Sequence, residues 1–164
     1  MRRSHSCRKD IEVRLYRAGE EHLLQEIYVE STRRLNSKDY TPAQIERWVA
    51  KHSDLPEWSE RLLKSRPWVA VMNDHPVAFA ELESDGHIDF FYCHPDFQGH
   101  GAGSALMATL VAEARDLGLA ELRAEVSVTA EPFFSKSGFR TVEERNPFII
   151  DAPAKQYLMR KSLS

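Results

Sequence analysis

Three glycines at alternate positions form the stretch of the chain best suited to bind a ligand. Gly99, Gly101 and Gly103 follow the apolar run HIDFFYC and precede a segment whose apolar residues have helical spacing. Glycines let the backbone approach a ligand closely, and a helix N-terminus presents unpaired N–H groups and a partial positive charge. The loop and the helix that follows it therefore predict an anion site, most suitably for a phosphate.

The spacing of this loop disfavours two common kinds of phosphate site. A P-loop ends in Gly-Lys-Ser/Thr, but no lysine lies in or near the loop. A dinucleotide fingerprint needs G-x-G-x-x-G; counting from Gly99 places Ser104 at the last glycine position, and counting from Gly101 places Leu106 there. The loop therefore fits neither a mononucleotide with magnesium nor a dinucleotide.

The elements that position this loop follow from the periodicity of the chain. Alternating or continuous apolar runs predict strands at 11–17, 68–72, 77–82, 87–93, 122–128, 140–145 and 155–162. Helical spacing predicts helices at 20–35, from Thr41 onward, at 54–64, from the glycine loop to Gly118, and at 131–136. Thr41-Pro42-Ala43-Gln44 has the pattern of a capping box with proline at the first helical position.

Composition limits the class of protein. The 164 residues, of which 42% are hydrophobic, suffice for one domain with an ordinary core. A net charge of -3 gives no support for nucleic-acid binding. No apolar run approaches ~18 residues, so we expect a soluble, non-exported protein without a membrane segment. Residues 1–10, MRRSHSCRKD, predict a flexible tail, or alternatively a nucleic-acid arm, ahead of a domain at 11–164.

The two cysteines differ in their setting. Cys7 lies in the polar tail and Cys93 in an apolar strand, so we expect no structural disulfide and a reducing, cytoplasmic location. Cys93 could instead be a nucleophile, but no recognisable motif places a histidine or an acid beside it, and buried structural cysteine is the commoner case. The seven histidines lack H-x-x-x-H spacing and no C-x-x-C pair occurs, so no metal is expected.

The loop also matches a known signature. Gln98-x-x-Gly101-x-Gly103 fits the pattern Q/R-x-x-G-x-G/A, and with it the chain resembles the GNAT superfamily of N-acetyltransferases. FYCHPDFQGHGAGSAL looks like that family's strand, turn and pyrophosphate loop, and PFFSKSGF looks like its late helix with the closing Gly-Phe. The predicted order of elements is also that of the family, from about Val13 onward.

Within the family the chain most resembles a bacterial subgroup. That subgroup has an Ile-Asp pair on the central strand, here Ile88-Asp89, and a Ser-x-Thr-Ala-x-Pro-Phe-Phe run, here 127–134. Its Met-x-Lys-x-Leu ending corresponds to 159–163. The resemblance implies an α/β fold with a single mixed, mostly antiparallel sheet and helices on both faces. Its fourth and fifth strands are expected to splay apart and admit the pantetheine arm of acetyl-CoA.

The resemblance also implies the residues that bind acetyl-CoA. They are Tyr92, Cys93, His94, Gln98, Gly99, His100, Gly101, Ala102, Gly103, Ser104, Phe133 and Phe134. The backbone of the strand end would pair with pantetheine, and one N–H would polarise the thioester carbonyl. Two of these residues depart from the family pattern. His100 replaces a frequent lysine or arginine, and Phe134 replaces the tyrosine that usually protonates the departing thiolate; Tyr157 is a candidate substitute, and water alone could suffice.

Two acids inside predicted central strands are candidate catalytic residues. An amine with a pKa of ~10.4 is protonated at pH 7, and removing its proton costs ~4.6 kcal/mol, so a nearby carboxylate would assist as a base. Asp89 lies in HIDFFYC, and Glu125 lies in LRAEVSV at a position that matches a base-bearing glutamate in some family members. Acids are scarce in such strands. The alternative is a structural carboxylate paired with Arg123, His87 or a backbone turn.

The expected function is transfer of an acetyl group from acetyl-CoA to a primary amine. The acceptor is a small molecule or a peptide amine, because fold-level resemblance does not fix the acceptor pocket. The alternative is an acyl-CoA-binding sensor or interaction module with little or no turnover, which Phe134 and the modest charge of the loop favour. The resemblance also implies a homodimer. Trp48 and Trp58 fall in the helical region that shapes the acceptor pocket in the family.

Overall fold

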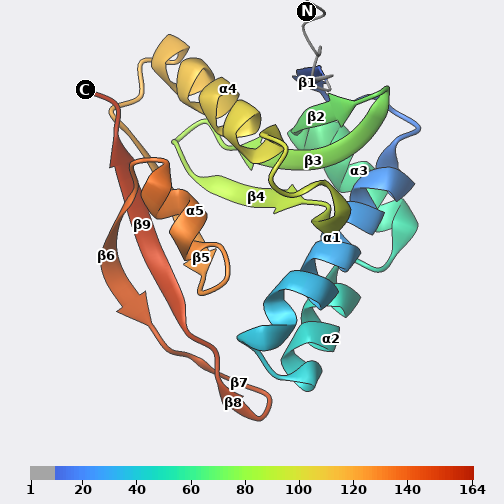
Figure 1. Ribbon diagram of the computed structural model, residues 1–164, viewed down its shortest axis with the longest axis vertical. Helices are drawn as coiled ribbons and strands as arrows, with labels where there is room; N and C mark the ends of the chain where they lie inside the picture. The colour runs from blue at the N-terminus through green and yellow to red at the C-terminus, as the bar shows by residue number, and fades with distance from the viewer. Residues whose placement is uncertain (1–9) are drawn as a thin grey trace, which may run out of the picture.

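The computed structural model describes residues 10–164, which form three groups of paired strands and five α-helices (Figure 1). The strands are β1 (Ile11–Leu15), β2 (Trp68–Met72), β3 (His75–Leu82), β4 (Ile88–Cys93), β5 (Glu121–Ser127), β6 (Arg140–Arg145), β7 (Phe148–Ile149), β8 (Ala152–Pro153) and β9 (Gln156–Ser162). The helices are α1 (Glu21–Leu35), α2 (Pro42–Lys51), α3 (Leu55–Ser65), α4 (Ala102–Asp116) and α5 (Glu131–Lys136), with short 3-10 turns η1 (Asn36–Lys38) and η2 (Pro95–Phe97).

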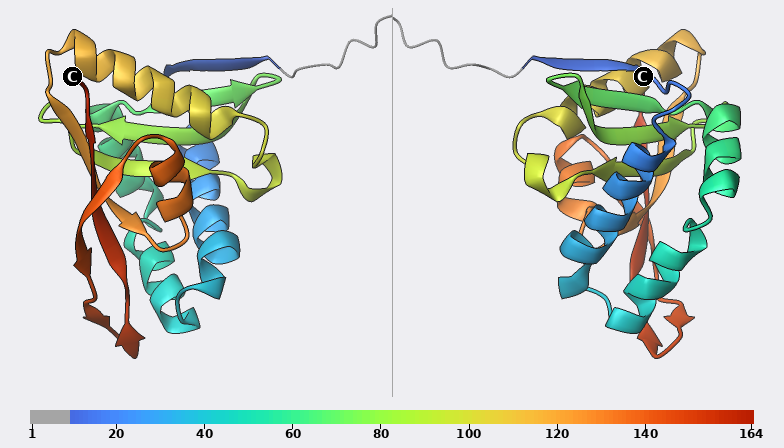
Figure 2. Two further views of the ribbon diagram at one scale, coloured as in Figure 1. Left: turned by 60° about the vertical axis from the view of Figure 1, so that its left-hand side comes forward. Right: turned by 90° about the vertical axis from the view of Figure 1, so that its right-hand side faces the viewer.

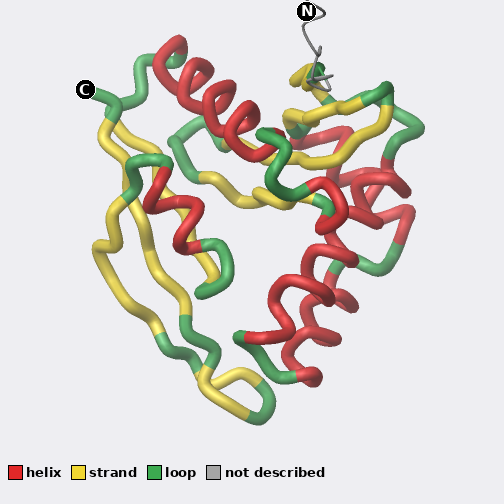
Figure 3. Tube along the Cα trace, in the orientation of Figure 1, coloured by secondary structure: helices red, strands yellow, loops and turns green. Residues whose placement is uncertain are grey.

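The strands pair in two main sheets. β1, β2, β3 and β4 form one antiparallel sheet in that order, and β5, β9 and β6 form a second, with β7 and β8 as a small ribbon (Figure 3). A parallel bridge between His87 and Arg123 joins the two sheets, and the Arg123 N–H donates to the Gly86 carbonyl at 3.0 Å. The mixed α/β arrangement with mostly antiparallel pairing is therefore confirmed. The ladder of strand hydrogen bonds is interrupted between β4 and β5, which belong to different sheets.

Gly86 permits the close approach at this bridge. Its φ is +93°, and a Cβ placed on it would lie 2.5 Å from the carbonyl oxygen of Glu121. Only a residue without a side chain fits there without displacing backbone. The backbone bridge between the two sheets thus depends on a glycine in the turn before β4.

Helices cover both faces of the first sheet because its strands are apolar on both sides. Along β2, Val69 and Val71 pack with α1 and α3, whereas Ala70 and Met72 pack with α4. The side views show α4 on one side of this sheet and α1 with α3 on the other (Figure 2). The core under α4 continues onto the second sheet through residues such as Leu122, so one apolar cluster joins the two sheets.

A β-bulge interrupts the pairing of β4 with β3 near the start of β4. The register with β3 shifts so that Asp89 and Phe90 lie opposite the single residue Glu81. As a result Ile88 packs in the core beneath α4 while Phe90 packs with α1 and α3, although residues two apart in a regular strand share a face. The bulge therefore sets which way each side chain of β4 points beyond this position.

Most predicted elements occur within about two residues of their predicted ends. The capping box of α2 is confirmed, since Thr41 Oγ1 accepts from the Gln44 N–H at 3.2 Å and Gln44 Oε1 accepts from the Thr41 N–H at 3.1 Å. Gly118, with a φ of +73°, directly follows the C-cap of α4 as expected. The ribbon of β7 and β8 was not predicted. The predicted tail lies outside the described residues, except for Asp10.

Candidate functional site

A cavity of about 710 Å³ opens between the two sheets. Its walls come from β4 and the first turn of α4 on one side, from β5 and α5 on the other, and from α1 and α2 below. Residues of the glycine loop and both candidate acids, Asp89 and Glu125, line it. The cavity thus brings together residues that lie more than 30 positions apart in the sequence.

The glycine loop has the geometry of an anion site. Gly99 and Gly101 have φ values of +78° and +90°, in the left-handed region that favours glycine, and Gly101 is the N-cap of α4. Gly103 lies against α5, because a Cβ on it would come within 3.2 Å of the Phe133 ring. The N–H groups at the start of α4 lack intrahelical acceptors, and the residues that carry them line the cavity. This end of the cavity suits a phosphate.

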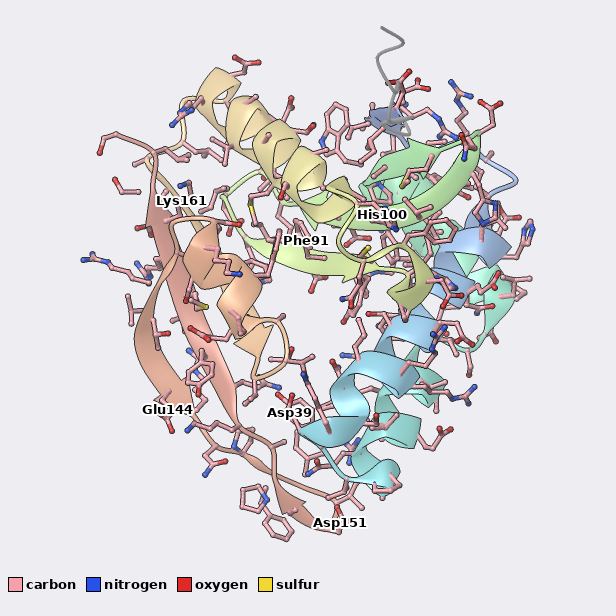
Figure 4. The ribbon with its side chains drawn as sticks, in the orientation of Figure 1. Asp39, Phe91, His100, Glu144, Asp151 and Lys161 are labelled. Atoms are coloured by element: carbon pink, nitrogen blue, oxygen red, sulfur yellow. The ribbon has the colours of Figure 1, made fainter. Side chains whose placement is uncertain are left out.

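Most of the predicted loop residues line the cavity. Those that do are Gln98, Gly99, Gly101, Ala102, Gly103 and Ser104. His100 is exposed and is not among the residues that line it, and Figure 4 shows it in the loop ahead of α4. Any contact of His100 with a bound phosphate stays a prediction.

The end of β4 supplies two of its three predicted residues to the cavity. Tyr92 and Cys93 line it, whereas His94 does not. The His94 N–H donates to the Val77 carbonyl at 2.8 Å, and its Nδ1 accepts from the Asp96 N–H at 3.2 Å. Because the His94 N–H is bonded to β3 and successive N–H groups of a strand point to opposite sides, the Cys93 N–H points away from β3 and is free for a thioester.

Cys93 has the properties of a buried structural thiol. Burial raises the pKa of Cys93 to about 11, and its Sγ–H donates weakly to the His94 carbonyl at 3.6 Å. The thiolate is the reactive form of cysteine. The group is therefore protonated at neutral pH, which argues against a nucleophilic role.

The aromatic residues of α5 pack on β4. The Phe91 ring, labelled in Figure 4, lies with its centroid 5.2 Å from that of Phe133 and 5.6 Å from that of Phe134. Both residues of α5 line the cavity, and Phe134 is buried against Phe139. Tyr157, the candidate substitute for a proton donor, lies on β9 and is not among the residues that line the cavity.

Asp89 belongs to a charged network that reaches into the core. Arg61 on α3 contacts Asp89 at 2.5 Å and the buried Glu81 at 3.0 Å through the same nitrogen. The Ser65 hydroxyl donates to the other oxygen of Glu81 at 2.7 Å. Burial raises the pKa of Glu81 above its ordinary value despite these partners. The guanidinium also lies 4.4 Å from the centre of the Phe90 ring, so Arg61 is held from several sides.

Glu125 is paired with a histidine. Its Oε2 lies 2.5 Å from Nε2 of His87, whose Nδ1 lies 3.1 Å from Oε1 of Glu83. Burial, the largest influence on Glu125, raises its pKa, but the hydrogen bond and charge of His87 outweigh it and hold the pKa below its ordinary value. Burial likewise lowers the pKa of His87, and its bonds to Glu125 and Glu83 reverse the direction and raise it.

Aromatic and polar side chains of α1, of α2 and of the residues next to α2 complete the cavity. Tyr28, Tyr40 and Trp48 line it, and the hydroxyls of both tyrosines donate to backbone carbonyls at 2.6 Å. His52 lines it as well, and burial beside Arg61 lowers the pKa of His52 to about 4. Short-range sequence patterns gave no signal for the tyrosines and His52. Of the two tryptophans of this region, Trp48 lines the cavity and Trp58 is a buried core residue.

One group of metal-ligand residue types occurs among residues 10–164. Donor atoms of Glu83, His87 and Asp89 lie within 4.8 Å of one another. Asp89 already contacts the Arg61 guanidinium, whose positive charge opposes a cation at this point. The cluster therefore has the character of an ion-pair network.

Comparison with known proteins identifies the family. The family model described as Acetyltransferase (GNAT) domain matches residues 36–148. The chain belongs to the GNAT acetyltransferases. This GNAT chain is 33% identical over 136 residues to the uncharacterised N-acetyltransferase YafP of Escherichia coli. The aligned region covers 83% of this chain and 85% of YafP.

Solved structures of GNAT proteins share the fold. A GCN5-related N-acetyltransferase from Rhodopseudomonas palustris is 29% identical, with a TM-score of 0.85 over 92% of this chain and 94% of that one. The PaiA N-acetyltransferase of Thermoplasma acidophilum, solved in complex with coenzyme A, is 18% identical with a TM-score of 0.74 over 93% of this chain and 99% of that one. GNAT membership supports acetyl transfer from acetyl-CoA.

No helix in the described part of this GNAT chain has the length and apolarity of a membrane span.

Proposed function

We propose that the protein transfers an acetyl group from acetyl-CoA to a primary amine held in the cavity between the sheets. The observation that carries the proposal is that one cavity contains both a glycine loop at a helix N-terminus and two carboxylates on facing strands. The first suits the pyrophosphate of CoA, and the second suits an ammonium group. The cavity thus contains groups suited to each of the two substrates of an N-acetyltransferase.

The loop and the edge of β4 would hold the cofactor. N–H groups from Gly101 to Ser104 are proposed to bind the pyrophosphate, with the α4 dipole adding to the attraction. The pantetheine arm would lie along β4, where the backbone of Tyr92 and Cys93 borders the cavity. One N–H of this strand end would polarise the thioester carbonyl and stabilise the charge that develops on its oxygen.

Glu125 is the proposed general base. It would take one proton from the acceptor ammonium, directly or through water, and the neutral nitrogen would then attack the thioester carbonyl. The C–N bond forms as the C–S bond breaks. The second proton of the nitrogen then passes to the departing sulfur, with water as the carrier. Asp89 would orient the amine or the water.

Turnover and binding together test this function. Free-thiol release is measured with acetyl-CoA and a panel of small primary amines, amino acids and short peptides, and calorimetry measures the binding of acetyl-CoA and CoA. Amine-dependent release of thiol, with an acetylated product seen by mass spectrometry, supports the proposal. Tight binding of CoA without release for any amine would contradict the proposal and favour a sensor module.

The acceptor, the oligomeric state and the compartment are finer parts of the proposal. A small-molecule or peptide amine is the proposed acceptor, and the panel is built to separate these classes. A homodimer is carried over from the family resemblance, and a cytoplasmic setting is proposed from the settings of Cys7 and Cys93 in the sequence. Light scattering of the purified protein tests the dimer by its mass.

A further inference from the structure

His87 lies between two carboxylates that come from different parts of the chain. We propose that His87 is a positioning residue for Glu125, carrying a positive charge at neutral pH and holding this carboxylate ionised and fixed through one oxygen. The proposal rests on the proposed function, in which Glu125 is the base. It adds a residue that acts on the base without contacting the substrate.

The geometry of the ring favours the charged form. Nε2 lies 2.5 Å from Glu125 and Nδ1 lies 3.1 Å from Glu83, so both ring nitrogens face carboxylate oxygens. A neutral imidazole has one N–H and one lone pair, and the lone pair would then point at an anion. Only the imidazolium donates to both partners. Charge-assisted bonds of this kind are also stronger than neutral ones.

The charges that surround His87 act in the same direction. Donor atoms of Asp89 and Glu83 lie within 4.8 Å of a ring nitrogen of His87, which places a third carboxylate near the ring. The other charged groups that face this cluster are Arg61 on Asp89, Arg123 beside its bridge partner His87, Asp85 on the His87 N–H, and Arg145 near Glu125. Arg61 and Arg123 are each paired with an acid, Asp89 and Asp85 respectively. The raised pKa of His87 agrees with this balance.

The backbone holds the ring at the point where the two sheets meet. His87 is one half of the bridge to Arg123, and its carbonyl accepts from the Glu83 N–H at 2.8 Å. Neither His87 nor Glu83 is among the residues that line the cavity, whereas Glu125 is. His87 therefore contacts Glu125 from behind, on the side away from the substrate space.

The two carboxylate oxygens of Glu125 have different partners in this arrangement. Oε2 of Glu125 is bonded to His87, which leaves Oε1 for the acceptor amine or a water. A fixed, ionised carboxylate attracts the ammonium form of the substrate and is ready to take its proton. The cost is a lower intrinsic basicity, because the imidazolium holds the pKa of Glu125 down.

The test compares His87→Ala and His87→Gln with wild type, with His22→Ala as the control because His22 is an exposed histidine on α1. We expect His87→Ala to lower kcat/KM at pH 7 by on the order of tenfold and to move the acid limb of its pH profile to higher pH. His87→Gln, whose amide still donates one hydrogen bond, should recover part of the loss. Glu83→Gln should act in the same direction with a smaller effect. Melting temperatures are measured alongside.

A second measurement does not depend on turnover. Nitrogen NMR of the imidazole side chains should show His87 protonated at both ring nitrogens at pH 7. A neutral His87 ring, or a His87→Ala protein with the rate and pH profile of an active wild type, overturns the inference. Loss of activity in step with melting temperature, without a displaced profile, also overturns it. If the wild type acetylates no amine, the proposed function itself fails, and the role of His87 fails with it.

Discussion

The guanidinium of Arg61 lies 2.5 Å from the carboxylate of Asp89. Arginine does not lose its charge in proteins, so this acid has a permanent cationic partner. Glu125, in contrast, is paired with His87, which can titrate. The two acids that line the cavity therefore have different electrostatic settings, which favours Glu125 as the group that exchanges a proton.

Exchange of Glu125 for glutamine tests the base directly. We expect Glu125→Gln to lower kcat/KM at pH 7 by ~10²–10⁴-fold. The deficit should shrink as the pH approaches the pKa of the amine, where much of the substrate is already neutral. Asp89→Asn should cost less and show less rescue at high pH. The measurement is the pH profile of kcat/KM for both variants, with the exposed Glu60→Gln as the control.

The opposite pattern would reverse this assignment. If Glu125→Gln is nearly fully active at pH 7 and Asp89→Asn shows the pH-rescued defect, Asp89 is the base. If either variant loses melting temperature and activity together at every pH, that carboxylate is structural.

Substitution of Gly101 tests the cofactor site. Its φ of +90° at the N-cap of α4 is strongly disfavoured for a β-branched residue, so Gly101→Val should distort the loop and lower CoA affinity at least tenfold, about 1.4 kcal/mol. Gly19, with a φ of +100° between β1 and α1, provides a matched control, since Gly19→Val imposes the same strain away from the cavity. Calorimetric titration with CoA compares the two. Equal affinities in two folded variants would count against the loop.

The network around Glu81 predicts a stability effect. Arg61→Met would leave the buried carboxylate of Glu81 with only the Ser65 hydroxyl, and we expect a loss of about 2 kcal/mol in unfolding free energy by denaturant titration. Adding Glu81→Leu should recover much of it, because the unpaired buried charge is then gone. Arg33→Met is the control. It breaks an exposed ion pair with Glu46 and should change stability by less than ~1 kcal/mol.

Cys93 should be unreactive. With its pKa raised to about 11, the thiol is almost fully protonated at pH 8. We therefore expect iodoacetamide to modify Cys93 far more slowly than a free thiol at this pH, with the rate rising toward pH 11, and Cys93→Ser to retain activity. Mass spectrometry of the fragment that contains Cys93 follows the labelling. Fast modification at pH 7, or an inactive but folded serine variant, would instead support a nucleophilic role for Cys93.

The pair of His87 and Glu125 predicts a pH-dependent contribution to stability. The folded pKa of His87 is raised, so its contribution is complete below about pH 6.5 and is lost as the pH rises through the folded value. The folded pKa of Glu125 is lowered, so its contribution is present above its ordinary value and is lost only at more acid pH. Thermal melting of His87→Gln should therefore show a larger deficit at pH 6 than at pH 9. A deficit that grows toward pH 9 would contradict the charged pair.

Local patterns predicted the elements that depend on neighbouring residues. Thr41 and Gln44 are three apart, so their reciprocal caps were legible in the sequence, and the glycine loop was legible for the same reason. The bond between His87 and Glu125 joins residues 38 positions apart, and it was foreseen only as one of several partners for a structural carboxylate. Its geometry depends on how two sheets meet, which no short-range pattern encodes.

The bulge in β4 and the lining of the cavity were also beyond local patterns. Asp89 and Phe90 face Glu81 together because strand pairing shifts, a feature that alternation in HIDFFYC does not reveal. Tyr28 and His52 reach the cavity from α1 and the end of α2, and their spacing is equally consistent with a core position. The short ribbon of β7 and β8 was missed because two-residue strands carry no periodicity.

The division between β4 and β5 gives the protein two strand edges that face inward. An open strand edge presents unpaired N–H and C=O groups, and on a protein surface such an edge invites pairing with other chains. Here both edges border the cavity, so the molecule itself shields them from neighbouring molecules. The same groups should exchange their amide hydrogens readily while the cavity holds only water, and slowly once a bound ligand accepts from them. The N–H groups of Cys93 and Glu125 point away from β3 and β9, so their exchange would report occupancy strand by strand.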